Sequence, residues 1–229
     1  MPPELSYVFW PLATVVIYAL ARQLYRRGPS WWNSPLLLTP AVLLALALAM
    51  HTRYSEYMQG SQWLLAMIGP ITVAFALPVY EQRALILRYW PALLIGVLAG
   101  SGIAALSAWL LATWLELPPE LQRSIVPRSV ASPFAMHMSR ELGGIPELTA
   151  AFVVITGVLG AVMGQFMRRL LPLRSSLARG ALLGMGAHGA GVAKAREYAA
   201  EEGSVASLVM ILAGLVNVTL TPAAVMLLL

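Results

Sequence analysis

The sequence predicts an all-α polytopic membrane protein in which nearly all of the mass lies in transmembrane helices. Of its 229 residues, 59% are hydrophobic and only 11% are charged. A soluble domain carries about 25% charged residues, so this chain has too little polar sequence to cover a water-facing surface. A spanning helix needs roughly 20 apolar residues, and the length therefore accommodates about six to eight membrane segments.

The composition also excludes several classes of site. There are no cysteines, which excludes disulfides, iron–sulfur clusters and thiolate zinc sites. The net charge is +5, but the arginines stand in short loops beside apolar runs, a pattern that reports membrane orientation. The histidines are scattered, and no phosphate loop or dinucleotide fingerprint occurs. We therefore expect no metal, no cofactor, no nucleic-acid partner and no enzymatic activity.

Eight segments follow one another along the chain. They occupy residues 7–24, 35–50, 63–80, 89–114, 124–139, 147–171, 180–200 and 204–229. Prolines interrupt some of them, and 180–200 is rich in glycine and only weakly apolar. In hydrocarbon, a broken helix survives only inside protein or beside a water-filled cavity. We expect about six full transmembrane helices plus two broken or re-entrant segments.

The halves 7–114 and 124–229 repeat one order of segments, with a broken segment before the last span. Arginines cluster at 22–27 and 168–179, and both clusters belong on the cytoplasmic side by the positive-inside rule. The N-terminus is then external, and the halves have opposite orientations if each broken segment re-enters from one side. Inverted repeats with broken helices are typical of transporters.

The first candidate site begins at Arg128. Ser129 and Ser132 are three residues apart, so on a helical turn they would share one face. Pro133 frees nearby carbonyl groups, and Arg128 can pair with an anionic ligand in bidentate fashion. The alternative is that Arg128 reaches a lipid headgroup while the serines bond back to their own helix.

The second candidate site surrounds His188. Neighbouring small residues, among them Gly189 and Gly191, would let a ligand approach, and a broken helix here would aim N–H groups at an anion. His188 titrates near neutrality. The alternative is an interfacial loop histidine beside a solvated pair of Lys194 and Glu197. We expect the two candidate sites to lie close together in the folded protein, at the membrane midplane.

Other polar residues complete the set. Glu81 occupies in the first half the place that Glu197 has in the second. Both carboxylates and His188 are candidates for taking up a coupling proton, although Glu81 could equally pair with Arg83. Asn217, within the last span, is a secondary polar residue, and most such residues form hydrogen bonds between helices.

A series of ordered motifs resembles the LrgB/CidB family and covers most of the chain. The motifs are residues 128–136, 143–146, 148–150, 156–157, 179–180, 187–189 with Glu197, 203–208 and Pro222, preceded by 33–36 and 78–82. The family usually has lysine in place of Arg128 and threonines in place of Ala131 and Ser132. It also usually has threonine in place of Val192.

The resemblance implies a multi-pass protein of the bacterial inner (plasma) membrane that works beside a smaller LrgA/CidA-type partner. We also expect a homo-oligomer, with a dimer as the first guess. Such pairs are classically described as holin/antiholin-like regulators of murein hydrolase activity and autolysis. A plant relative resembles a glycolate/glycerate translocator, and bacterial members are linked to pyruvate-like carboxylates. The inverted repeat favours transport of small monocarboxylates, and the family label favours regulation by oligomerisation in the membrane.

Overall fold

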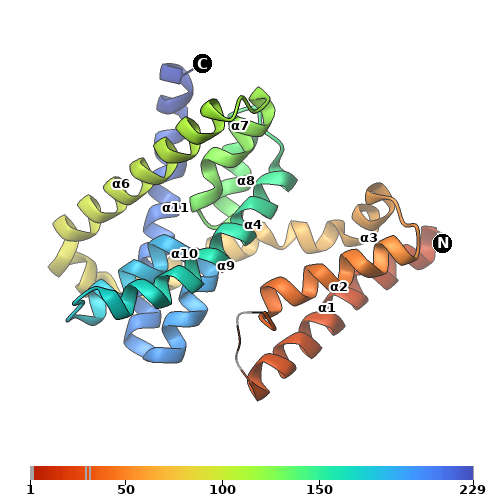
Figure 1. Cartoon of the computed structure of the whole chain (residues 1–229), viewed down its shortest axis with the longest axis horizontal. Helices are drawn as coiled ribbons and strands as arrows, with labels where there is room; N and C mark the ends of the chain where they lie inside the picture. The colour runs from red at the N-terminus through yellow and green to blue at the C-terminus, as the bar shows by residue number, and fades with distance from the viewer. Residues whose placement is uncertain (1–2, 29, 31, 229) are drawn as a thin grey trace. The chain divides into compact units, whose positions relative to one another are not determined.

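The computed structural model describes residues 3–28, 30 and 32–228, and that part of the chain is helical without strands (Figure 1). It divides into two compact units, Met1–Ala74 and Phe75–Leu229. Among the described residues, 5 helical runs are long and apolar enough to cross a membrane, and one shorter apolar helix is α2 (Pro35–Ala49). The predicted all-α polytopic membrane fold is therefore confirmed.

The first unit contains α1 (Pro3–Arg27), α2, α3 (Tyr54–Ala66) and α4 (Ile68–Ala74), and α1 packs against both α2 and α3. Trp10 of α1 is fully buried, and its ring meets that of Tyr57 edge to face at 5.3 Å between centroids. Gly60 lies directly against the backbone carbonyl of Ser6, so α1 and α3 approach more closely there than any side chain would allow.

The run at 63–80 is broken as its prolines predict. It is divided among α3, α4 and α5 (Ala76–Glu81). Pro70 and Pro78 are each the third residue of a short helix. A proline ring clashes with the turn before it, and each break falls in that preceding turn.

The second unit is built around three long helices, α6 (Arg83–Trp114), α9 (Pro146–Leu170) and α11 (Ala200–Leu228). Between α6 and α9 the chain forms α7 (Pro119–Ile125), the 3-10 helix η1 (Val126–Ser129) and α8 (Ser132–Glu141). Between α9 and α11 it forms the bent helix α10 (Ser176–Tyr198). Both of these connecting segments turn back on themselves.

Hairpin 1, residues 119–141, turns at Val130 and Ala131, which have extended backbone conformations. Its two arms end at the same level, because the Thr149 hydroxyl near the start of α9 bonds to both of them. It lies 2.9 Å from the Ser124 carbonyl oxygen and 2.7 Å from the Ser139 hydroxyl. Ser124, Ser139 and Thr149 are fully buried. The base of hairpin 1 is thus closed by a buried hydroxyl network that includes the Ser124 backbone carbonyl.

Hairpin 2, residues 176–198, turns at His188, whose backbone angles are φ 45 and ψ −124. Gly191 beyond the turn lies directly against the carbonyl oxygen of Leu183 before it. Eight residues of straight helix would separate these two positions by about 12 Å. The two arms of α10 therefore lie side by side, and His188 is at the tip.

Helix α9 shows how far each hairpin reaches. Its 25 residues correspond to about 37 Å, slightly more than the roughly 30 Å hydrocarbon core of a bilayer. The ingoing arm of hairpin 2 follows the C-terminal half of α9 up to its middle. The contacts along this path are Gly164 with Leu183, Gly160 with Gly186, and Gly157 with Ala187.

Hairpin 1 covers the other half of α9. Helix α8 packs on α9, where Val153 shares a buried cluster with Phe134 and Met138, and Thr149 closes the base. The two hairpins thus start from opposite ends of one membrane-length helix and meet near its middle. The interruptions predicted at 124–139 and 180–200 are confirmed, while the longer inverted repeat of 7–114 and 124–229 stays a prediction.

Candidate functional site

The tips of the two hairpins meet at one junction. Helix η1, at the tip of hairpin 1, contacts α10, and the His188 ring faces the backbone of Ser129. Val130 and Ala131 share a buried apolar cluster with Val192 of hairpin 2. The two candidate sites predicted from separate parts of the sequence therefore lie together, as expected.

Buried polar nitrogens from both hairpins remain without partners at this junction. His188 is 3% exposed, and neither of its ring nitrogens makes a well-formed hydrogen bond with any described residue. Nη1 of Arg128, one residue before Ser129, is also buried without such a partner. Each unsatisfied buried donor or acceptor costs about 1–3 kcal/mol. Groups left in this state are suited to a ligand that completes their hydrogen bonds.

Ser129 and Ser132 do not share a helical turn, so the expectation that they form one face is wrong. Ser129 ends η1, Ser132 begins α8, and extended residues separate them. The reason is Pro133, which lacks an N–H and is favoured in the first turn of a helix, so α8 begins beside it. The N-terminus of α8, where free N–H groups attract anions, consequently lies at the tip of hairpin 1.

A second helical segment begins at the tip of hairpin 2, directly after His188. Gly189, its first residue, is exposed, with open space where a side chain would stand. Gly191 is buried against the ingoing arm and serves the packing of the hairpin. The junction therefore combines two helix starts with a guanidinium and an imidazole, an arrangement that can hold a small anion.

The structure leaves the other predicted polar residues away from the tips. Nζ of Lys194 lies 2.7 Å from a carboxylate oxygen of Glu197, and both side chains are partly exposed. Glu81 is exposed, and Arg83 donates to the Tyr80 carbonyl at 3.1 Å without an ion pair to Glu81. The expected pairing of Lys194 with Glu197 is confirmed.

Asn217 joins two long helices. Its side-chain amide donates to the Ser101 hydroxyl on α6 at 2.6 Å and to the Ala213 carbonyl on α11 at 2.7 Å. This is the interhelical hydrogen bonding that the sequence predicted for a polar residue inside a span.

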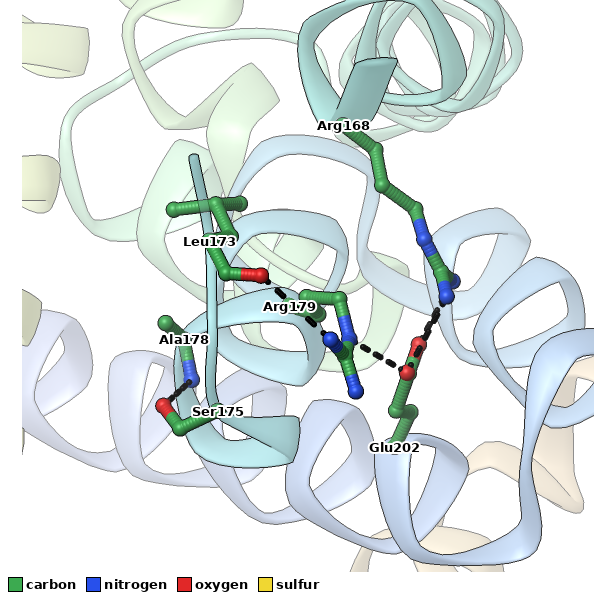
Figure 2. Close-up of polar contacts among 6 residues, drawn as sticks. All are labelled: Arg168, Leu173, Ser175, Ala178, Arg179 and Glu202. Atoms are coloured by element: carbon green, nitrogen blue, oxygen red, sulfur yellow. Dashed lines mark hydrogen bonds and ion pairs between the residues drawn. The ribbon is translucent and has the colours of Figure 1, made fainter. Parts of the chain in front are cut away.

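One buried ionic cluster was missed by the sequence reasoning (Figure 2). Glu202 in the first turn of α11 is 2% exposed, and both of its oxygens accept hydrogen bonds from arginines. The guanidinium group of Arg168 donates at 2.6 and 3.1 Å through Nη1 and Nη2, and Arg179 donates through Nε at 2.7 Å. Arg168 also stacks on the ring of Tyr198 at 3.8 Å.

In the sequence, Arg168 and Arg179 indicated only which side of the membrane is cytoplasmic. Glu202 stands beside Glu201 at the start of an apolar run, where a solvated carboxylate is the ordinary expectation. One signal was available in the sequence. Arginines stand at the end of the span 147–171 and just before the segment 180–200, and two carboxylates stand just before the last span. Their sequence separations of 34 and 23 residues hide the contact from any local pattern.

A hollow of about 310 Å³ lies between α6, α10 and α11. Its lining is largely apolar, with Leu93, Val97, Met185 and Val209 among its residues. None of the predicted site residues lines it. The junction of the hairpin tips remains the place where polar groups gather.

Membrane-length helices and two oppositely directed hairpins with buried polar tips define an all-α polytopic membrane protein with two interrupted segments. The LrgB-like family matches residues 14–227, and the chain belongs to this family. No solved structure matches it.

Two groups of relatives illustrate the similarity. YwbG of Bacillus subtilis (strain 168) is 42% identical over 91% of this chain and 93% of its own length. Holin-like protein CidB of Staphylococcus epidermidis (strain ATCC 12228 / FDA PCI 1200) is 30% identical over 99% of both chains. Holin-like protein CidB of Staphylococcus aureus (strain Mu50 / ATCC 700699) is 28% identical over 94% of both.

Proposed function

We propose that this protein transports small monocarboxylates of the glycolate, lactate or pyruvate kind, and that they bind at the junction of the hairpin tips. The observation that carries the proposal is the set of unpartnered buried nitrogens of Arg128 and His188, contributed by opposite hairpins. They lie near the middle of α9, whose length matches a bilayer. An anion crosses a hydrocarbon barrier only if its charge is matched on the way.

The chemistry of the junction suits a carboxylate. The Arg128 guanidinium can bind a carboxylate through two parallel hydrogen bonds, and the helix starts at Ser132 and Gly189 offer N–H groups. The hydroxyls of Ser129 and Ser132 add short-range donors. A small ligand is favoured because Val130, Ala131 and Val192 close the junction with buried apolar contacts.

We propose His188 as the first residue to examine for proton coupling, since it is the titratable group that the junction buries. Glu197 and Glu81 remain further candidates for this role. The role that we propose for Lys194 is limited to its ion pair with Glu197. His188→Gln should therefore flatten the pH dependence of uptake more strongly than Glu197→Gln or Glu81→Gln, measured as initial rates in proteoliposomes over a pH series.

The cellular setting belongs to the same proposal. We place the protein in the bacterial inner membrane, with residues 168–180 on the cytoplasmic side, because arginines concentrate in that loop. A small LrgA/CidA-type membrane protein and a second copy of this chain are the proposed partners. The similarity to Holin-like protein CidB supports a bacterial membrane setting.

The second candidate function is holin- or antiholin-like regulation of murein hydrolase activity and autolysis. The names of the staphylococcal relatives, Holin-like protein CidB, favour it. A holin-like protein acts by oligomerising into a lesion or pore, and such a path would discriminate little between small solutes. A binding site between two hairpins predicts saturation, competition and exchange instead.

Proteoliposomes with the purified protein distinguish the two functions. Uptake of labelled glycolate, lactate and pyruvate should saturate, and an excess of one unlabelled carboxylate inside should accelerate entry of the labelled one. Labelled sucrose should not enter. If sucrose enters as fast as the carboxylates, the holin-like function is the better account. If no carboxylate enters, the transport proposal is wrong.

A further inference from the structure

The base of hairpin 2 is firmly held. Arg179 belongs to its ingoing arm and Tyr198 ends its outgoing arm, while Arg168 lies in the last turn of α9 and Glu202 in the first turn of α11. The ion pairs of Figure 2, together with the contact of Arg168 with the Tyr198 ring, connect all four of these positions. Every oxygen of the buried Glu202 carboxylate has a donor, and breaking a buried ion pair is costly.

The tip of hairpin 2 has the opposite character. His188 has a positive φ of 45, a conformation that non-glycine residues rarely adopt and that costs about 1–3 kcal/mol. Neither of its ring nitrogens makes a well-formed hydrogen bond with a described residue. A side chain at the neighbouring Gly186 or Gly189 would meet open space. The tip is therefore the part of the hairpin that least resists displacement.

The arms of hairpin 2 lie between the junction and the end of α9 that carries Arg168. The ingoing arm follows α9 from its middle, at Gly157, to the end that carries Arg168. Hairpin 1 occupies the other half of α9 and cannot separate the junction from the Arg168 side. A ligand that leaves towards Arg168 has to pass hairpin 2.

From this arrangement we infer that hairpin 2 is the gate on the Arg168 side of the junction, and that it opens at its tip while the Arg168–Glu202–Arg179 base stays fixed. This inference rests on the proposed transport function. Release of a ligand then requires the contacts of Ala187 and Ala190 with the middle of α9 to separate. The ion cluster positions the hairpin and does not need to break in each transport cycle.

A reversible covalent tie at the tip tests the inference. A Cβ at Gly157 would lie 3.6 Å from the Cβ of Ala190, within the range of about 3.5–4.5 Å found in disulfides. The chain has no cysteines of its own. Gly157→Cys/Ala190→Cys should form an intramolecular disulfide on oxidation, followed by mass spectrometry, and carboxylate exchange in proteoliposomes should fall at least tenfold. Reduction should restore exchange.

The matched control ties hairpin 1 to the same helix at its base. Ser139→Cys/Thr149→Cys replaces two hydroxyls that lie 2.7 Å apart, and its disulfide should leave exchange within about twofold because the tie lies at the base and leaves the tip of hairpin 2 free. Each single cysteine variant should be unaffected by oxidation.

The outcomes separate this inference from the proposed function. Exchange that persists with the tip fully disulfide-bonded would overturn the gate and leave the transport proposal standing. Equal loss in the base-tied control, or no disulfide at the tip, would also overturn the gate. If the wild-type protein exchanges no carboxylate, the transport proposal and this inference fall together.

Discussion

The buried carboxylate of Glu202 gives a quantitative prediction for stability. Glu202→Ala would leave Arg168 and Arg179 facing each other without the oxygens that accept their hydrogen bonds at 2.6, 2.7 and 3.1 Å. Removing one partner of a buried ion pair typically costs about 3–5 kcal/mol. The arginine side chains are 22% and 28% exposed, so water recovers part of the loss. We expect the lower end, about 3 kcal/mol, or roughly a hundredfold in the unfolding equilibrium.

Reversible unfolding in mixed detergent micelles, followed by circular dichroism, measures this free energy. The neighbouring residue supplies the control, because Glu201 is exposed and Glu201→Ala should change the free energy of unfolding by less than about 0.5 kcal/mol. Glu202→Gln keeps the side-chain volume but not the charge, and it should also destabilise the protein. Equal effects of Glu201→Ala and Glu202→Ala would refute the reasoning, since the calculated cost depends entirely on burial and pairing.

Two further predictions rest on local contacts, and a third rests on the predicted topology. Thr149→Val removes the hydroxyl that closes hairpin 1 and should cost about 1–3 kcal/mol of unfolding free energy in the same assay. Gly160→Ala would drive a methyl group into the Gly186 carbonyl and should destabilise or separate α9 and α10, whereas Gly186→Ala meets open space and should be tolerated. In intact cells, cysteines at Ser30 and Ser175 should resist an impermeant thiol reagent and react after permeabilisation.

A specific outcome would contradict each of these three predictions. Ser107→Ala removes an exposed hydroxyl that bonds only to its own helix, and a Thr149→Val effect no larger than that of Ser107→Ala would argue against the hydroxyl network. Equal tolerance at Gly160 and Gly186 would contradict the close approach of α9 and α10. External labelling at Ser30 or Ser175 would reverse the predicted topology.

Local chemistry made the helix interruptions predictable from the sequence. Proline clashes with the helical turn before it, and that rule located the breaks near Pro70, Pro78 and Pro133, although α1 and α2 continue through Pro11 and Pro40. The glycine-rich surroundings of His188 likewise indicated where a helix would be interrupted. Asn217 was recognised because a polar side chain in a span needs a partner on a neighbouring helix.

Tertiary contacts account for what the sequence could not predict. The side-by-side arms of hairpin 2 depend on Gly191 meeting Leu183 across the turn at His188, and no periodicity of the sequence reports that. The error about Ser129 and Ser132 arose because spacing was converted to a helical face without placing the start of α8. Burial of Glu202 required three helix ends to converge, which one sequence does not reveal.

The central claim is that Arg128 binds a small carboxylate at the junction of the hairpin tips, and substrate exchange tests it directly. Charge-assisted hydrogen bonds contribute about 1.5–3 kcal/mol each, so Arg128→Ala should lower the initial rate of carboxylate exchange in proteoliposomes by roughly ten- to a hundredfold. Arg128→Lys, which keeps the charge but not the bidentate geometry, should retain an intermediate rate. Arg123→Ala, on α7 towards the base of the same hairpin, should exchange like the wild type. An Arg128→Ala protein that exchanges carboxylates as fast as the wild type would contradict the account.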